Sequence, residues 1–259
     1  MSKVISKDGT PIAYDRWGSG PALVLVDGAM GHRAFGSMPA LAKLLADEFT
    51  VYAYDRRGRG ESGDTAPYAV AREVEDLGAL IEEAGGSAYV YGISSGGALT
   101  LEAAAGGLPI ARMALYEPPY TAARFGPERK KEYTERLESL ITAGRNGDAV
   151  AYFLNFVGNP PEAVDGMRHS PVWPMFEAVA PTLAYDNAVL GEAVVPVALA
   201  ARVTVPALVV DGGASPDAMR SACGAIAEAL PAARYRTLAG ETHQVSPTAL
   251  APVLREFFR

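Results

Sequence analysis

A serine between two glycines is the clearest candidate for chemistry in this chain. Residues 92–96 read Gly-Ile-Ser-Ser-Gly and match the pattern G-x-S-x-G around Ser94. The pattern lies between an apolar run typical of a strand, 88–93, and an alanine-rich stretch typical of a helix, 95–106. The glycines leave room for a tight turn, so we expect the Ser94 hydroxyl to stand exposed at the helix N-terminus, where it could act as a nucleophile.

A serine hydroxyl is a weak nucleophile until a neighbouring base accepts its proton. The chain has three histidines, His32, His169 and His243. His243 lies in a loop between a predicted strand, 233–240, and the predicted final helix, 247–258, so we predict that it is the general base. His32 is expected either to line the substrate pocket or to be a surface loop residue, and His169 to be a surface or packing residue.

The elements that must position these residues alternate between short apolar runs and helical stretches. A hairpin is expected over 2–18, around Asp8-Gly9. The predicted strands then cover 22–27, 50–55, 88–93, 112–117, 206–212 and 233–240, and the predicted helices cover 37–49, 68–85, 95–106, 217–230 and 247–258. This alternation predicts an α/β fold with a mostly parallel, twisted sheet flanked by helices.

Residues 118–200 interrupt the alternation and are mostly helical. A segment of this length is too long for a loop, so we predict a helical cap over 118–200 that divides a core domain into 1–117 and 201–259. The alternative is a structural subdomain without a role at the substrate. An aromatic-rich stretch in this segment predicts an apolar wall over the serine that includes Trp173, although Trp173 could equally be ordinary packing.

Composition limits the classes of partner that the chain is expected to bind. The chain has 259 residues, of which 49% are hydrophobic and 20% charged, and a net charge of −7, which is typical of a globular protein and unfavourable for nucleic acid or an anionic membrane. No signal peptide or membrane-spanning run is visible, and Cys223 is the one cysteine, expected in the core of a helix. A cytoplasmic location is therefore predicted, and the sequence predicts no particular oligomeric state.

The segment Asp55–Ser62 reads Asp-Arg-Arg-Gly-Arg-Gly-Glu-Ser and is similar to the D-x-R-G-x-G-x-S segment of the α/β-hydrolase family. Together with G-x-S-x-G and the late histidine, it makes essentially the whole chain resemble that family. The resemblance implies an α/β-hydrolase fold and a catalytic triad in the chain order serine, acid, histidine. We expect an arginine of this segment to hold loops together through its contacts rather than to take part in catalysis.

The acid is where this chain departs from the commoner family pattern, which has aspartate shortly after the next-to-last strand. Here that place is taken by Ser215. Glu117, at the end of the strand after the nucleophile helix, offers the alternative acid position. With G-x-S-S-G, this combination resembles the zearalenone lactonases, and it implies that Glu117 orients His243. Asp217 and Asp211 stay open as alternatives.

The resemblance also implies an oxyanion hole formed by two backbone amides. They are expected at Ser95 and at either Gly28 or Ala29, in a loop where Asp27-Gly28 replaces the usual His-Gly. Tyr120 is expected at the edge of the pocket.

We therefore predict a serine hydrolase that cleaves a small-molecule carboxylic ester or lactone. No metal or organic cofactor is implied, because the sequence has none of the usual binding motifs. A serine at the nucleophile position argues against epoxide or haloalkane chemistry. Carbon–carbon bond hydrolysis, perhydrolysis, acyl transfer and a non-catalytic small-molecule receptor remain alternatives.

Overall fold

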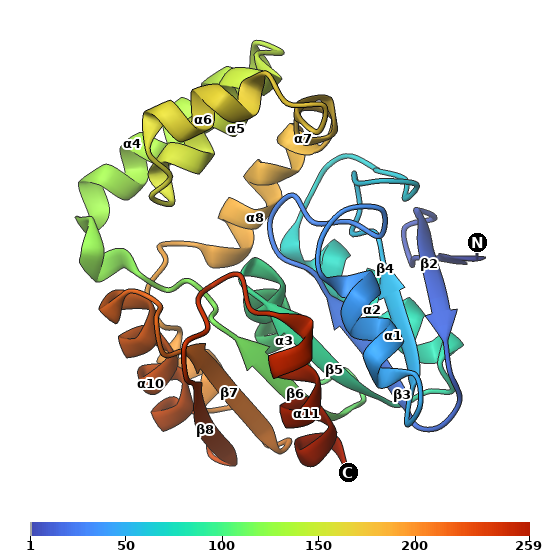
Figure 1. Ribbon diagram of the computed structural model, residues 1–259. Coiled ribbons are helices and arrows are strands. Elements are labelled where there is room, and N and C mark those ends of the chain that lie inside the picture. Colours follow the sequence, from blue (N-terminus) through green and yellow to red (C-terminus); the bar gives the residue numbers. More distant parts are fainter. Residues whose placement is uncertain (1) are drawn as a thin grey trace.

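An eight-stranded sheet forms the centre of the computed structural model, which describes residues 2–259 (Figure 1). Its order is β1-β2-β4-β3-β5-β6-β7-β8, with β1 and β2 antiparallel to their neighbours and every other pair parallel. The strands are β1 (Ser2–Ile5), β2 (Pro11–Trp17), β3 (Ala22–Val26), β4 (Thr50–Tyr54), β5 (Ala88–Ile93), β6 (Ile110–Tyr116), β7 (Ala207–Gly212) and β8 (Ala233–Leu238).

The central strands are mostly apolar because helices cover both faces of the sheet, and the charged exceptions in β6 and β7 are Arg112 and Asp211. On one face pack α2 (Val70–Glu83), α3 (Ser95–Ala105) and α10 (Asp217–Ala229). On the other face pack α1 (Met38–Leu45) and α11 (Pro247–Phe258). Two hydrophobic cores therefore lie on opposite sides of the sheet, and Cys223 is fully buried in the first of them, as expected.

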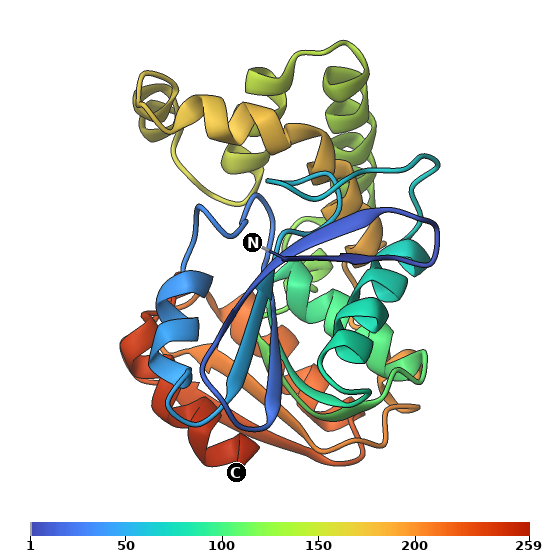
Figure 2. The ribbon, with the colours of Figure 1, turned by 90° about the vertical axis from the view of Figure 1, so that its right-hand side faces the viewer.

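A helical insertion lies over the edge of the sheet at which the parallel strands end (Figures 1 and 2). Its elements are η1 (Ala122–Arg124), α4 (Gly126–Thr142), α5 (Asn146–Phe156), α6 (Pro161–Arg168), α7 (Trp173–Val179), η2 (Ala180–Thr182), α8 (Leu183–Leu190) and α9 (Val197–Ala200). We call this insertion the cap. Most of it packs around a third hydrophobic core, which also contains Met30 from the loop after β3.

The structure confirms the predicted fold class, while several element boundaries differ from expectation. The helix expected over 37–49 ends at Leu45, and the chain then turns so that the carbonyls of Ala46 and Phe49 pack against Gly18, where a side chain would overlap them. The end of α8 and α9 pack against the core beside α3 rather than within the cap core. The domain boundaries at 117 and 200 remain a prediction.

Within residues 2–259, no helix combines the length and the hydropathy that crossing a bilayer would require.

Candidate active site

Ser94 occupies a strained turn between β5 and α3. Its backbone has φ 56° and ψ −129°, a conformation that side-chain-bearing residues rarely adopt and that costs roughly 1–3 kcal/mol. A Cβ on Gly92 would overlap the Gly96 carbonyl, and a Cβ on Gly96 would overlap the carbonyls of Val26 and Asp27. Both glycines of the motif are therefore needed for the close approach that the turn requires, as the sequence predicted.

The Ser94 side chain is partly exposed, at the N-terminus of α3. The amides of Gly97 and Ala98 donate to the backbone carbonyl of Ser94. The Ser94 hydroxyl does not cap the helix. In the described part of the chain no hydrogen bond joins this hydroxyl to His243. Such bonds are often long in unliganded enzymes and tighten when a substrate binds.

Glu117 and His243 form the central contact of the site. The Glu117 Oε2 atom lies 2.8 Å from His243 Nδ1, and the Gly212 amide donates to Glu117 Oε1 at 2.8 Å. The Glu117 side chain is fully buried, whereas that of His243 is 40% exposed. Because Nδ1 is held by a buried carboxylate, Nε2 is the ring nitrogen left for chemistry.

The pKa of Glu117 lies below its ordinary value. Burial is the largest effect and would raise this pKa, but hydrogen bonding from the His243 imidazole and the Gly212 amide, together with the nearby Ser215 hydroxyl, outweighs it. Ser215 is buried and stands where the commoner pattern has aspartate, so a neutral hydroxyl now faces the glutamate. The missing acid at this place was predicted from the sequence, whereas the position of Ser215 beside Glu117 was not.

The loop that carries His243 is held by several backbone contacts. The Tyr116 hydroxyl donates to the Thr242 carbonyl at 2.6 Å, and the Ala214 amide donates to the Glu241 carbonyl at 2.9 Å. The Glu241 carboxylate in turn accepts from the amide and the hydroxyl of Ser246. The imidazole therefore extends from a fixed loop rather than from a free one.

Neither alternative acid contacts His243. Asp211 is buried, accepts a 2.5 Å hydrogen bond from the Tyr235 hydroxyl and lies 3.5 Å from the Arg220 guanidinium. Asp217 is exposed at the start of α10. The geometry therefore favours Glu117 as the acid.

The loop after β3 lies directly beside Ser94. A Cβ built on Gly28 would be 2.9 Å from Ser94 Cβ and 3.5 Å from Ser94 Oγ. The Gly28 amide is already occupied, because it donates to Asp27 Oδ1 at 2.8 Å. The amides of Ala29 and Ser95 have no partner within residues 2–259, so Ala29 rather than Gly28 is the better candidate for the second oxyanion donor.

The carboxylate of Asp27 is buried beneath this loop, and its Oδ2 atom has no hydrogen-bond partner in the described chain. Burial raises the pKa of Asp27 to about 6, against the opposing effects of the Gly28 amide and the nearby Arg59 and Arg56 guanidinium groups. The loop curls around this carboxylate so closely that a side chain at Gly31 would overlap it. The Asp27 carboxylate thus lies against the inner side of the loop and accepts the Gly28 amide.

The other histidines differ in their surroundings. His32 lies in the same loop, is 9% exposed and packs its ring against Phe35, which contacts Phe176 of the cap edge to face. Burial, the largest effect, lowers the pKa of His32. His169 is exposed and its Nδ1 atom lies 2.9 Å from the Asp165 carbonyl, in agreement with a surface role.

Tyr120 and Trp173 are placed less favourably for substrate contact. Tyr120 is 6% exposed and lies in the hydrophobic core beside α3. Trp173 is 5% exposed, packs in the cap core and donates from Nε1 to Glu177 at 3.0 Å. Of the two alternatives for Trp173, packing is the one that its surroundings favour.

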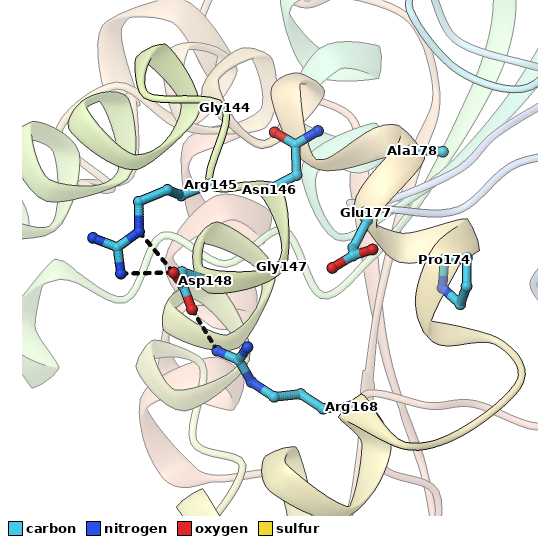
Figure 3. Close-up of a pocket in the computed structure, with 9 residues that line it drawn as sticks. All are labelled: Gly144, Arg145, Asn146, Gly147, Asp148, Arg168, Pro174, Glu177 and Ala178. Carbon is cyan, nitrogen blue, oxygen red and sulfur yellow. Dashed lines mark hydrogen bonds and ion pairs between the residues drawn. The ribbon is translucent and has the colours of Figure 1, made fainter.

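A hollow of about 590 Å³ is lined by cap residues, and its charged side chains already have partners (Figure 3). Asp148 accepts hydrogen bonds from Arg145 at 2.8 Å and from Arg168 at 2.9 Å. Glu177, on the opposite wall, is the partner of the Trp173 indole. In the described chain the hollow therefore offers no free charged group, and Ser94 remains the stronger candidate site.

The assembled groups are those that acyl transfer requires. They comprise a hydroxyl in a strained turn, an imidazole oriented by a buried carboxylate, and two backbone amides near the hydroxyl that have no partner among residues 2–259. No cluster of three or more metal-ligating side chains occurs among residues 2–259.

Comparison with known proteins agrees with this arrangement. A family model described as the alpha/beta hydrolase family matches residues 13–253. An alpha/beta hydrolase from Sphaerobacter thermophilus is 53% identical over 100% of both chains, with a TM-score of 0.90.

More distant structures share the fold. A thermophilic esterase from Thermogutta terrifontis is 23% identical over 100% of this chain and 97% of its own, with a TM-score of 0.75. The enol-lactonase from Burkholderia xenovorans is 23% identical over 99% of each chain, with a TM-score of 0.70.

Proposed function

Because the chain belongs to the alpha/beta hydrolase family, we propose that it is a serine hydrolase that cleaves a small-molecule carboxylic ester or lactone. The observation that carries the proposal is the 2.8 Å contact between His243 Nδ1 and the buried Glu117 carboxylate, at the sheet edge where the strained Ser94 also lies. A surface histidine in a merely structural loop would have no need of a buried, ionised partner.

In the proposed reaction, Ser94 Oγ attacks the substrate carbonyl while His243 Nε2 accepts the hydroxyl proton. The Glu117 carboxylate stabilises the imidazolium that forms, and the amides of Ser95 and Ala29 donate to the developing oxyanion. Collapse of the intermediate releases the alcohol, which takes the proton from His243. Water, deprotonated by His243, then hydrolyses the acyl-enzyme to release the acid and restore Ser94.

The choice of ester or lactone rests on the similar structures. The Thermogutta protein is an esterase and the Burkholderia protein an enol-lactonase, and both share the fold of this chain at low identity. In a lactone the released alcohol stays attached to the acyl group, so the same residues would serve both substrates.

The experiment is steady-state hydrolysis of a nitrophenyl ester series and a macrolactone by the wild type, Ser94→Ala and Ser87→Ala. Ser87 is an exposed serine just before β5, whereas Ser94 follows the same strand, so Ser87→Ala is a matched control. We expect Ser94→Ala to lose roughly 10⁴-fold or more in kcat and Ser87→Ala to keep wild-type rates. Turnover that survives in Ser94→Ala, or a wild type that neither hydrolyses these substrates nor is labelled by a fluorophosphonate, would overturn the proposal.

A further inference from the structure

Arg59 is fully buried between the loop after β3 and the cap, and each nitrogen of its guanidinium has a partner. Nη1 donates to the Gly28 carbonyl at 2.5 Å and to the Gly31 carbonyl at 3.3 Å. Nη2 lies 2.8 Å from both carboxylate oxygens of Asp186, and Nε donates to the Thr182 hydroxyl at 3.1 Å. One side chain thus joins the loop after β3 to α8 and η2 of the cap. We call this loop the oxyanion loop, because it carries the Ala29 amide.

The contact with Gly28 determines where the Ala29 amide points. The Gly28 carbonyl and the Ala29 N–H belong to one planar trans peptide, so the two bonds point in opposite directions. Because Arg59 holds the carbonyl, the N–H must point away from Arg59. A charged donor on the carbonyl oxygen also polarises the peptide and makes its N–H a stronger donor.

The opposite side of the proposed oxyanion hole is tied to the same carboxylate. The Ser95 hydroxyl donates to Asp186 Oδ1 at 2.7 Å and accepts from Arg56 Nη1 at 3.2 Å. Arg56 Nη1 also donates to Asp186 at 2.7 Å. Asp186 therefore contacts Ser95, which carries one of the proposed donor amides, directly. It reaches the Gly28–Ala29 peptide, which carries the other donor amide, through Arg59.

Asp186 lies on α8, so these contacts make the oxyanion hole depend on the position of a cap helix. Met30, next to Ala29, packs in the hydrophobic core of the cap and reinforces this dependence. We infer that Asp186 and Arg59 are positioning residues that set the oxyanion hole from the cap. The inference rests on the proposed serine hydrolase function.

The test compares Asp186→Asn with Asp76→Asn in the full-length protein. Asp76 is also buried and holds Arg57 through two 2.7 Å hydrogen bonds, but its partner contacts Asp8 and the Arg72 carbonyl instead of the oxyanion loop. The two substitutions therefore disrupt similar buried ion pairs, and only one of them lies next to the proposed hole.

The readouts are kcat and KM on an ester, the inhibition constant of a trifluoromethyl ketone, which forms an oxyanion on Ser94, and the melting temperature. We expect Asp186→Asn to lower kcat by roughly 10–100-fold and to weaken ketone binding by a similar factor. The complete loss of one oxyanion donor lowers kcat by about 10²–10³-fold, and a displaced donor should have a smaller effect. The pH dependence of kcat/KM should keep its inflection, because the pair of Glu117 and His243 is untouched. Asp76→Asn should lower the melting temperature while leaving kcat and ketone binding within a few-fold.

Equal losses of ketone binding in both variants, or unchanged binding in Asp186→Asn, would overturn the inference. Arg59→Lys, which keeps the charge but cannot reach all these partners, gives the same comparison if Asp186→Asn does not fold. A wild type without hydrolysis or labelling of Ser94 would instead refute the proposed function, so the two failures are distinguishable.

Discussion

Glu117 reaches His243 across the end of an intervening strand. The glutamate follows β6 and the histidine follows β8, yet Oε2 and Nδ1 are 2.8 Å apart, because the side chain passes the end of β7 and accepts the Gly212 amide on the way. The residue is held in this direction by a positive φ of 45° and by the two prolines that follow it. The proposed acid thus lies one strand away from the commoner position.

Substitution of Glu117 by Gln should remove the negative charge while preserving the shape of the side chain. We expect kcat to fall by roughly 10²–10⁴-fold with little change in KM, because the imidazolium loses its counter-charge and the imidazole its fixed tautomer. Steady-state kinetics on the ester that the wild type hydrolyses fastest would measure both kcat and KM. Asp211→Asn and Asp217→Asn are the controls and should stay within a few-fold of the wild type, and a greater loss in either would move the acid there.

An aspartate at position 215 should partly replace Glu117. Ser215 is buried beside the glutamate, so a carboxylate placed there would approach His243 from β7 instead of β6. We expect the double variant Glu117→Gln/Ser215→Asp to recover at least roughly tenfold in kcat over Glu117→Gln, equivalent to about 1.4 kcal/mol of transition-state stabilisation. Equal rates for the single and double variants would show that the glutamate position cannot be exchanged.

The buried carboxylate of Asp27 should make stability depend on pH. Its pKa is raised to about 6 in the folded protein, so the folded state holds this proton more tightly than the unfolded chain does. The resulting contribution to stability is fully present below the unfolded pKa and is lost as pH rises through about 6. Relative to the wild type, Asp27→Asn should therefore gain stability as pH rises, which thermal melts between about pH 4.5 and pH 8 would measure; a difference independent of pH would contradict this.

Two helical glycines should respond oppositely to alanine. A Cβ at Gly96 would overlap the carbonyls of Val26 and Asp27, whereas a Cβ at Gly224 in α10 would meet nothing within 4 Å. Gly96→Ala should therefore lower the melting temperature and abolish activity, since it forces the nucleophile turn away from the oxyanion loop. Gly224→Ala should raise stability by roughly 0.5–1 kcal/mol through helix propensity and leave kcat unchanged. Wild-type kcat in Gly96→Ala would show that the turn tolerates wider spacing.

Removal of the Tyr120 hydroxyl tests whether this residue contacts substrate. The hydroxyl is buried without a partner in the described chain, and burial raises its pKa. Because an unpartnered buried hydroxyl is unfavourable, Tyr120→Phe should be neutral or stabilise the protein by up to about 1 kcal/mol, with KM unchanged. A severalfold rise in KM would instead support the pocket-edge position that the sequence suggested.

The local sequence was sufficient to predict those elements whose residue pattern fits few other structures. The mostly apolar runs predicted β3, β5, β6 and β7, because strands of a parallel sheet that is covered on both faces are mostly apolar. The spacing of Gly92 and Gly96 predicted the turn at Ser94, since no larger residue fits there. The Glu117–His243 contact followed from the family resemblance rather than from spacing.

Orientation and long-range pairing were beyond the reach of the sequence. The choice between Gly28 and Ala29 depends on which way one peptide plane faces, and that is fixed by Arg59 from a different loop. Asp186 pairs with Arg56 and Arg59 across more than a hundred residues of chain. Aromatic residues such as Trp173 are equally suited to a pocket wall and to a helix interface, and only the packed structure distinguishes the two.

The buried ion pair between Arg59 and Asp186 also limits how the protein could diversify. Insertions over a hydrolase sheet are attractive modules for recombination, because replacing one could change substrate preference while the nucleophile is retained. Here a donor insertion that lacks an aspartate at position 186 would leave two buried guanidinium groups without their shared counter-ion. Chimeras should therefore be cut so that α8 stays with the sheet, and new specificity should be introduced through α4 to α7.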